Sequence, residues 1–230
     1  MAVRTWKRRL IWLAAVAIVT AIAALGLYRY AQSWAPARET YPMQGVELSA
    51  DQGTVEWPTL KARGVDFAYL RATSGEDGRD PAFPQHWQDA EAAGIGRGAV
   101  HVYNLCRTGH DQATNFIATV PREQNALPPA IEFAFQGNCA ARPSRDALVK
   151  EIETLVEMIE AHAGKNAILH ISPDFEDSYR LATAIDRNLW LSREFLPPAY
   201  GGRPWVMWQA SAMRQIEGID GPVNWNVIRA

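Results

Sequence analysis

The stretch VDFAYLRATSGEDGRDPAFPQHWQDAEAAGIGRGAVHVY, residues 65–103, decides the fold. It opens on an apolar run typical of a strand (65–71) and closes on another (97–103). Between them, residues 84–93 form a predicted helix that ends at Gly94, a residue suited to a helix C-cap. The order strand, helix, strand predicts two parallel strands joined by a helical crossover.

The same alternation continues on both sides of this stretch. Further strands are predicted at 45–48, 130–135, 167–171, 189–192 and 205–210, further helices at 57–63, 111–120, 144–162 and 173–181, and a tail at 223–228 that closes the chain. Repeated alternation predicts the α/β class with a mainly parallel sheet. The number of strands favours a single irregular TIM-like (β/α) barrel without helices between its later strands, and a doubly wound sheet is the alternative. In a barrel, the functional residues lie at the C-terminal ends of the strands.

The N-terminus has a different composition. The chain has a formal net charge of −2, but residues 1–34 carry five basic residues and no acid, so the remainder is acidic. Between Arg9 and Arg29 lie nineteen uncharged residues, which as a helix span about 28 Å, close to the hydrocarbon core of a bilayer. The sequence therefore predicts a cytoplasmic segment (1–9), a transmembrane signal anchor (10–28), a linker (29–42) and a domain at 43–230.

The basic cluster before the apolar run predicts the topology. Positive residues stay on the cytoplasmic side, so we expect a single-pass protein of the inner membrane whose domain is periplasmic or otherwise extracytoplasmic. The alternative is a cleaved signal peptide, since Ala21-Ile22-Ala23 resembles a cleavage site. Export would permit a disulfide between Cys106 and Cys139, with two free thiols as the alternative.

Composition and missing motifs exclude several functions. Hydrophobic residues at 48% and charged residues at 21% are ordinary globular values. An acidic domain without a basic face argues against a nucleic-acid partner. No cofactor or metal is predicted, because the glycines at 94–98 lack dinucleotide-loop spacing and the five histidines form no H-x-x-x-H pair. A serine-hydrolase G-x-S-x-G motif is also absent from the sequence.

Motifs in a shared order point to a family. They are GVELS (45–49), QGTVEW (52–57), FAYLRATSG (67–75), GAVH (98–101), LPPAIEFAF (127–135), GNC (137–139), LW (189–190), WQ (208–209) and GIDGPVNWN (218–226). In this order they resemble glycoside hydrolase family 25, the Chalaropsis-type lysozymes, and especially its membrane-anchored proteobacterial branch. The resemblance implies a lysozyme-like barrel and a peptidoglycan substrate. The implied activity is cleavage of the β-1,4 bond between N-acetylmuramic acid and N-acetylglucosamine.

The resemblance also places the acidic cluster of the family, and all four positions depart from it. They are Glu47, Glu132, Ala134 and Asn224. Ala134 stands where the family has its general acid, so a methyl group replaces the proton donor. The implied substrate-binding positions are Arg71, His101, His170, Trp190, Trp208 and Asn226. For these, the alternatives are a core role for His101 and the tryptophans, and a simple ion pair of Glu132 with Arg71.

Glycoside hydrolysis needs a carboxyl group that protonates the leaving oxygen. Glu132 faces the same side of its strand as position 134, but their Cα atoms are about 6.6 Å apart and glutamate adds only one methylene. We therefore predict a non-catalytic, glycan-binding pseudo-enzyme. The alternatives are a weak muramidase that uses Glu47 or Glu132, and a protein-interaction scaffold. The sequence names no protein partner.

Overall fold

The structure is a computed structural model that describes residues 2–135 and 139–229, so the predicted GNC motif lies partly outside the described residues. The chain forms two compact units, Met1–Trp34 and Ala35–Ala230. The first unit is the helix α1 (Ala2–Ser33), which continues into the predicted linker. Within α1, Arg9–Ser33 is long and apolar enough to cross a membrane, by length and composition.

The second unit is a closed barrel. Its eight strands are β1 (Met43–Leu48), β2 (Phe67–Ser74), β4 (Gly96–Val102), β5 (Ala130–Phe133), β6 (Ile168–Ile171), β7 (Asn188–Ser192), β8 (Met207–Gln215) and β9 (Pro222–Ile228). They follow the order β1-β9-β8-β7-β6-β5-β4-β2, and the pairing of β1 with β2 closes the ring. The short β3 (Gly78–Arg79) forms a hairpin with β2. The predicted barrel is confirmed, and the doubly wound alternative is wrong because the sheet has no open edge between β1 and β2.

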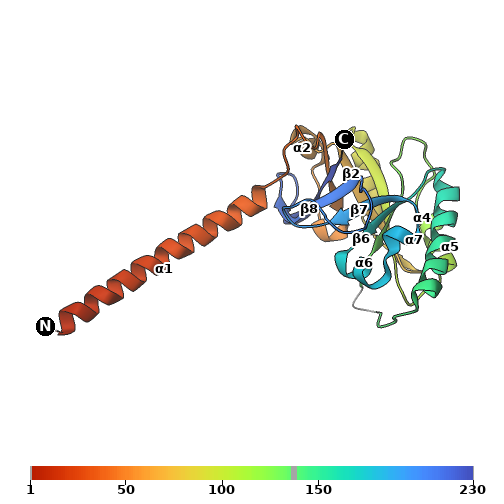
Figure 1. The fold of residues 1–230 in the computed structure, drawn as a ribbon. Helices are drawn as coiled ribbons and strands as arrows, with labels where there is room; N and C mark the ends of the chain where they lie inside the picture. The colour runs from red at the N-terminus through yellow and green to blue at the C-terminus, as the bar shows by residue number, and fades with distance from the viewer. Residues whose placement is uncertain (1, 136–138, 230) are drawn as a thin grey trace. The chain divides into compact units, whose positions relative to one another are not determined.

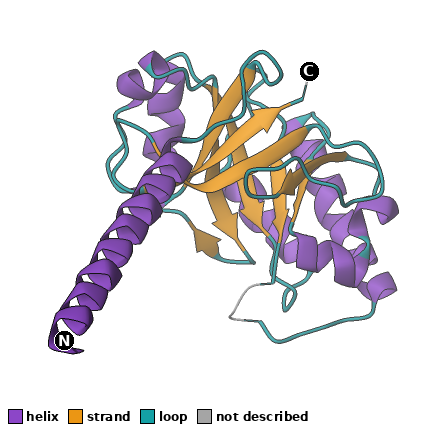
Figure 2. Cartoon of the chain, turned by 60° about the vertical axis from the view of Figure 1, so that its left-hand side comes forward, coloured by secondary structure: helices purple, strands orange, loops and turns teal. Residues whose placement is uncertain are grey.

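Helices cover the outside of the barrel (Figures 1 and 2). They are α2 (Trp57–Ala62), α3 (Phe83–Ala92), α4 (Gly109–Thr119), α5 (Arg145–Ala163), α6 (Pro173–Tyr179) and α7 (Leu181–Ala184), with a single 3₁₀ turn, η1 (Ala50–Gln52). No helix is described between β7 and β8 or between β8 and β9, as the sequence predicted for the later strands. The last strand runs antiparallel to both of its neighbours.

Two elements depart most from the prediction. The strand predicted at 205–210 begins at Met207 and runs on to Gln215, because β8 pairs along its whole length with β9. The helix predicted at 173–181 is broken at Arg180, which has a left-handed backbone with φ 48°. A non-glycine residue in that conformation ends a helix, so α6 and α7 are separate.

The interior is filled by side chains that alternate along the strands. Phe67, Tyr69, Val100, Ala130, Ile168, Trp190 and Met207 form one buried cluster. Residues between them on each strand point outward and are covered by the helices. Nearer the C-terminal ends of the strands, the inward-facing side chains are polar. Arg71 lies two residues after Tyr69 on β2, and Glu132 lies two residues after Ala130 on β5. The packed interior therefore forms the floor of any site at that end.

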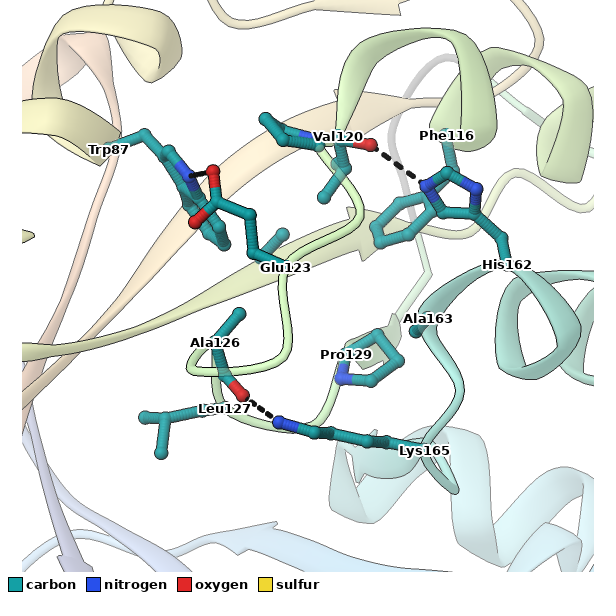
Figure 3. Close-up of a pocket in the computed structure, with 12 residues that line it drawn as sticks. Trp87, Phe116, Val120, Glu123, Ala126, Leu127, Pro129, His162, Ala163 and Lys165 are labelled. Atoms are coloured by element: carbon teal, nitrogen blue, oxygen red, sulfur yellow. Dashed lines mark hydrogen bonds between the residues drawn. The ribbon is translucent and has the colours of Figure 1, made fainter.

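The other end of the barrel is closed by packing and ion pairs. A small cavity of about 20 Å³ lies there, beside the segments that lead into β5 and β6 (Figure 3). Arg97 is only 3% exposed and forms ion pairs with Glu123 and Glu91, while the Trp87 Nε1 donates to Glu123 at 3.2 Å. The Lys165 Nζ donates to a backbone carbonyl across the same cavity. This cavity has room for about one water molecule, so it is too small for a sugar.

Candidate active site

A polar hollow of about 240 Å³ opens at the C-terminal ends of β1 and β2. It is lined by Glu47, Leu48, Ser49, Asp51, Gln52, Arg71, Ala212, Pro222 and Asn224. A second hollow, of about 290 Å³, shares Ser49, Asp51 and Arg71 with the first and continues to β3. Because the two share these residues, they form one groove across the mouth of the barrel.

Two of the four acid positions meet directly at the hollow. Glu47 on β1 and Asn224 on β9 are paired across the strands, and the Asn224 Nδ2 donates to the Glu47 Oε2 at 3.0 Å. Glu47 is 5% exposed, and its Oε1 has no hydrogen-bond partner among the described residues. Burial raises the pKa of Glu47, against the opposing effects of Asn224 and the Arg71 charge. Glu47 is thus a buried carboxyl with only one of its two oxygens hydrogen-bonded within the described residues.

Glu132 on β5 faces Arg71 on β2. The Arg71 Nη2 lies 3.5 Å from the Glu132 Oε2, a long ion pair, and the Arg71 Nε has no partner in the described part of the chain. Burial and the nearby Glu47 carboxyl raise the pKa of Glu132. This is the ion pair that the sequence offered as the alternative for Glu132, and it holds the carboxyl beside Arg71.

His170 on β6 lies near Glu132 and Arg71 but lines neither hollow. Its ring stacks on Trp190 with centroids 4.1 Å apart, and its Nε2 lies 2.9 Å from the Ser192 Oγ. Burial lowers the pKa of His170 to about 4, so the ring is neutral at pH 7. The Trp190 Nε1 in turn donates to the Asn226 Oδ1 at 3.0 Å. Trp190 therefore packs against the His170 ring, and Asn226 fixes the Trp190 side chain.

Position 134 lies just beyond β5, two residues after Glu132 and on the same side by strand alternation. Its side chain is a half-buried methyl group. The Glu132 carboxyl is directed to Arg71 by their ion pair. The site therefore has two carboxyls with raised pKa values but none at position 134.

Two predicted substrate-binding residues lie away from this group. His101 is fully buried on the outer face of β4, between the Thr73 Oγ1 and the Gln112 Oε1, with Phe116 of α4 against its ring. Trp208 is on the outer face of β8, packed against Tyr41 and Trp205. At these two positions the side chains point away from the interior, so neither residue lines the groove.

Trp190 and Asn226 need a smaller correction. Both side chains point inward but are 0% exposed, so a ligand in the hollow cannot reach them. They support the site, and of the predicted binding residues only Arg71 lines the groove.

Sequence reasoning missed two supporting residues. Ser192 ends β7, and Tyr200 fixes it: the Tyr200 hydroxyl accepts from the Ser192 backbone N at 2.8 Å and bonds the Ile171 carbonyl oxygen at 2.7 Å. The polar Ser192 directly after the apolar run 189–191 was the available signal, since it marks the C-terminal end of a barrel strand. Together, Ser192 and Tyr200 orient His170.

Comparison with known proteins identifies the family. The model of the family described as Glycosyl hydrolases family 25 matches residues 46–219. The chain belongs to this family. A solved structure of a family 25 glycosyl hydrolase from Bacillus anthracis is 28% identical, with a TM-score of 0.80 over 86% of this chain and 93% of that chain. The resemblance seen in the motifs is thereby confirmed at the level of the family.

Two relatives by sequence cover most of the chain. The protein YegX of Escherichia coli strain K12, whose function is uncharacterized, is 29% identical over 82% of this chain and 70% of its own length. Lysozyme M1 of Streptomyces globisporus is 25% identical over 82% of this chain and 68% of its own length. The bacterial lysozyme structure from Streptomyces coelicolor, 24% identical with a TM-score of 0.74 over 82% of this chain and 92% of that chain, shares the fold.

Cys106 and Cys139 form a disulfide in this family 25 domain. It links the segment after β4 to the segment after β5, and so lies at the same end of the barrel as the groove. Among the residues that the structure describes, no group of three or more His, Cys, Asp or Glu side chains is placed to hold a metal ion.

The buried His101 predicts how stability depends on pH. The Gln112 Nε2 donates to three backbone carbonyls, so its Oε1 faces the ring and accepts from the His101 Nε2–H. Burial lowers the pKa of this neutral imidazole to about 4. The unfolded chain, with a histidine pKa of about 6.5, then binds more protons than the native state at mildly acid pH, so stability falls as pH falls.

We expect the free energy of unfolding to be about 2 kcal/mol lower at pH 5 than at pH 7.5 because of His101. The measurement is urea unfolding of the full-length chain in non-ionic detergent at both pH values, followed by near-UV circular dichroism. His101→Gln should remove this part of the pH dependence, whereas His110→Gln, at an exposed histidine, should keep it. Equal pH dependence in His101→Gln and wild type would contradict the assignment.

Proposed function

We propose that this chain is a membrane-anchored, glycan-binding member of family 25 that acts at peptidoglycan and no longer hydrolyses it. The observation that carries the proposal is Ala134. The family resemblance places the general acid there, and a methyl group donates no proton. General acid catalysis contributes about 10²–10⁴-fold to such reactions, so its loss leaves at most a small fraction of the activity.

The groove supports the binding half of the proposal. Its lining includes arginine, carboxyl and amide side chains, and sugars are recognised by such polar groups. Relatives named as lysozymes act on peptidoglycan, which makes its glycan strands the ligand to test first.

The N-terminal helix supports the location. Arg9–Ser33 is long and apolar enough to span a bilayer, and the basic residues precede it. With the basic end in the cytoplasm, the domain would face the cell wall from the outer side of the inner membrane. A tethered binding domain would then hold the membrane near the glycan strands.

A weak muramidase is the second candidate, and one observation favours it. Glu47 is a buried carboxyl with a raised pKa, the property that a general acid requires. In that case Glu47 would protonate the glycosidic oxygen in place of the missing acid, and Glu132 would stabilise the developing positive charge on the sugar.

One experiment separates the two. The full-length chain in non-ionic detergent is incubated with purified peptidoglycan, and co-sedimentation and new reducing ends are measured in the same tube. We expect sedimentation without reducing ends. Arg71→Gln, which alters one of the three residues shared by both hollows, should weaken binding at least tenfold, and Arg122→Gln, at an exposed arginine near the other end of the barrel, should not.

Two outcomes would contradict the proposal. Reducing ends that appear with wild type and vanish with Glu47→Gln or Glu132→Gln would establish the weak muramidase. No sedimentation by wild type would reject glycan binding and leave the interaction scaffold.

A further inference from the structure

The wall of the second hollow contains an exposed arginine. Arg79 ends the short strand β3, where it pairs with Thr73 of β2, and it lines the hollow together with Arg71. The residue is exposed, so a ligand in the hollow can reach it. Arg79 also lies outside the motifs that carry the family resemblance. The role of its side chain therefore has to be argued from its contacts.

A buried amide holds this arginine in place. Asn115 on α4 is 3% exposed, and its Oδ1 accepts from the Arg79 Nε at 3.1 Å. The Asn115 Nδ2 donates to the carbonyl oxygens of Gly75 and Gly78, at 3.1 and 2.9 Å. The same amide thus fixes both ends of the turn between β2 and β3. Arg79 is oriented before any ligand binds, which lowers the entropy lost on binding.

The partner of Arg79 is uncharged, so the positive charge is left for a ligand. Among the residues that the structure describes, the two Nη groups of Arg79 have neither an ion pair nor a hydrogen bond. Glu76, on the same turn, is paired with Arg107 at 2.9 Å instead. With Nε bound to Asn115, the two Nη groups form the edge of the guanidinium that can bind a carboxylate by two parallel hydrogen bonds.

The two acids that line this hollow are engaged within the protein. Asp80 accepts a backbone N–H at each of its two oxygens, in both cases at 2.8 Å. Asp51 accepts from the Ser49 Oγ at 3.1 Å. Ionised carboxylates only accept hydrogen bonds, so a further bond from Asp51 would suit a sugar hydroxyl. The lining groups that suit an anion are the guanidiniums of Arg79 and Arg71.

Of the two arginines, Arg71 is already turned to Glu132 by their long ion pair. We propose that Arg79 binds a carboxylate of peptidoglycan, which lets the groove distinguish the muramyl part of the glycan from uncharged polymers of N-acetylglucosamine. This inference rests on the proposed glycan-binding function, and it names the part of the ligand that the second hollow takes. The carboxylate belongs either to the lactyl group of the muramyl sugar or to the peptide stem attached to that group.

The test compares two forms of one ligand. Purified peptidoglycan is used intact, or after methylamine and a carbodiimide have converted its carboxylates to neutral methylamides. The full-length chain in non-ionic detergent is co-sedimented with each form at constant pH and low ionic strength. We expect wild type to bind the intact form about fivefold or more tightly, because charge-assisted hydrogen bonds are roughly twice as strong as neutral ones.

Three variants assign the effect to one side chain. Arg79→Gln should bind both forms as wild type binds the amidated form. Arg79→Lys keeps the charge without the planar fork, so its preference should be reduced and not lost. Arg122→Gln is the matched control, because it removes one exposed arginine near the other end of the barrel and should keep the wild-type preference. Near-UV circular dichroism of each variant shows whether the barrel is folded.

Soluble glycan strands used as competitors identify the source of the carboxylate. Strands stripped of peptide by an amidase carry lactyl carboxylates, whereas strands that keep their peptides carry the carboxylates of the stem. Equal competition by both supports the lactyl group, and stronger competition by the peptide-bearing strands supports the stem. In either case, chitin oligosaccharides should compete more weakly with wild type, because they have no carboxylate.

Several outcomes would overturn the inference and leave glycan binding intact. They are equal binding of intact and amidated peptidoglycan by wild type, a preference that survives in folded Arg79→Gln, and an equal loss on both forms in that variant. Absence of wild-type binding to either form overturns the proposed function as well. If reducing ends appear, the non-catalytic function is wrong, and the comparison of the two ligand forms still decides the role of Arg79.

Discussion

Glutamate at position 134 is expected to give this chain hydrolytic activity on peptidoglycan. The Ala134→Glu variant restores a carboxyl where the family resemblance places the general acid. Because general acid catalysis is worth about 10²–10⁴-fold, release of reducing ends should rise by about that factor above wild type. The measurement is the initial rate of reducing-end formation by the full-length chain in detergent.

The surroundings of position 134 favour a functional acid. The new side chain would point to the same side of the strand as Glu132, whose negative charge and partial burial raise the pKa of a neighbouring carboxyl. A raised pKa keeps the acid protonated near neutral pH, as a proton donor requires. Ala134→Glu alone tests whether the groove still positions a glycan for attack.

Ala134→Gln is the matched control, since it has the same size and a hydrogen-bond donor but no acidic proton. If both variants release reducing ends at the wild-type rate, Glu132→Asp and Asn224→Asp are added to rebuild the other acid positions. A rate that remains at the wild-type level in the triple variant, with binding retained, would mean that the groove no longer holds the glycan in a reactive position.

The barrel itself could be predicted because its signals are local. Each strand is a short apolar run, and each crossover helix has its own start and stop residues, such as Ser144 and Gly164 around α5. The family resemblance assigned Glu47, Arg71, Glu132 and His170 to one site, and in the structure they lie near one another at the C-terminal ends of their strands.

The direction of individual side chains could not be predicted in the same way. In a barrel covered by helices, both faces of a strand are buried, so apolar residues do not alternate with polar ones. The row 98–102 of β4 shows this, because Val100 faces the interior and the equally buried His101 faces α4. Trp208 was misplaced for the same reason.

Backbone irregularities were a second limit. The register of β8 against β9 shifts twice, between Gln209 and Ser211 and between Ser211 and Arg214. Each shift changes which face the following residues occupy. The residue types in this stretch do not indicate such a shift. The extension of β8 to Gln215 and the position of Ala212 in the lining of the hollow were therefore not predicted.

Removing the disulfide should cause the largest loss of stability of the changes considered. Cys106 and Cys139 are 33 residues apart, and closing a loop of that length in the unfolded chain is worth about 4 kcal/mol in the chain-entropy model. The Cys106→Ser, Cys139→Ser double variant should lose about that much free energy of unfolding. Urea unfolding of the full-length chain in detergent measures it, and reduced wild type should match the double variant.

Binding should survive this change, because the native contacts around the bridge do not depend on it. The Arg142 guanidinium lies over the Phe135 ring at 4.2 Å, and its Nη1 donates to the Cys139 carbonyl oxygen at 3.2 Å. These contacts hold Cys139 in place without the disulfide. On the other side, the Gln112 amide fixes the Asn104 backbone after β4. The loss then arises in the unfolded state, and peptidoglycan binding at temperatures below unfolding should stay within about twofold of wild type. Loss of binding by a variant that is still folded would instead mean that the disulfide positions the groove.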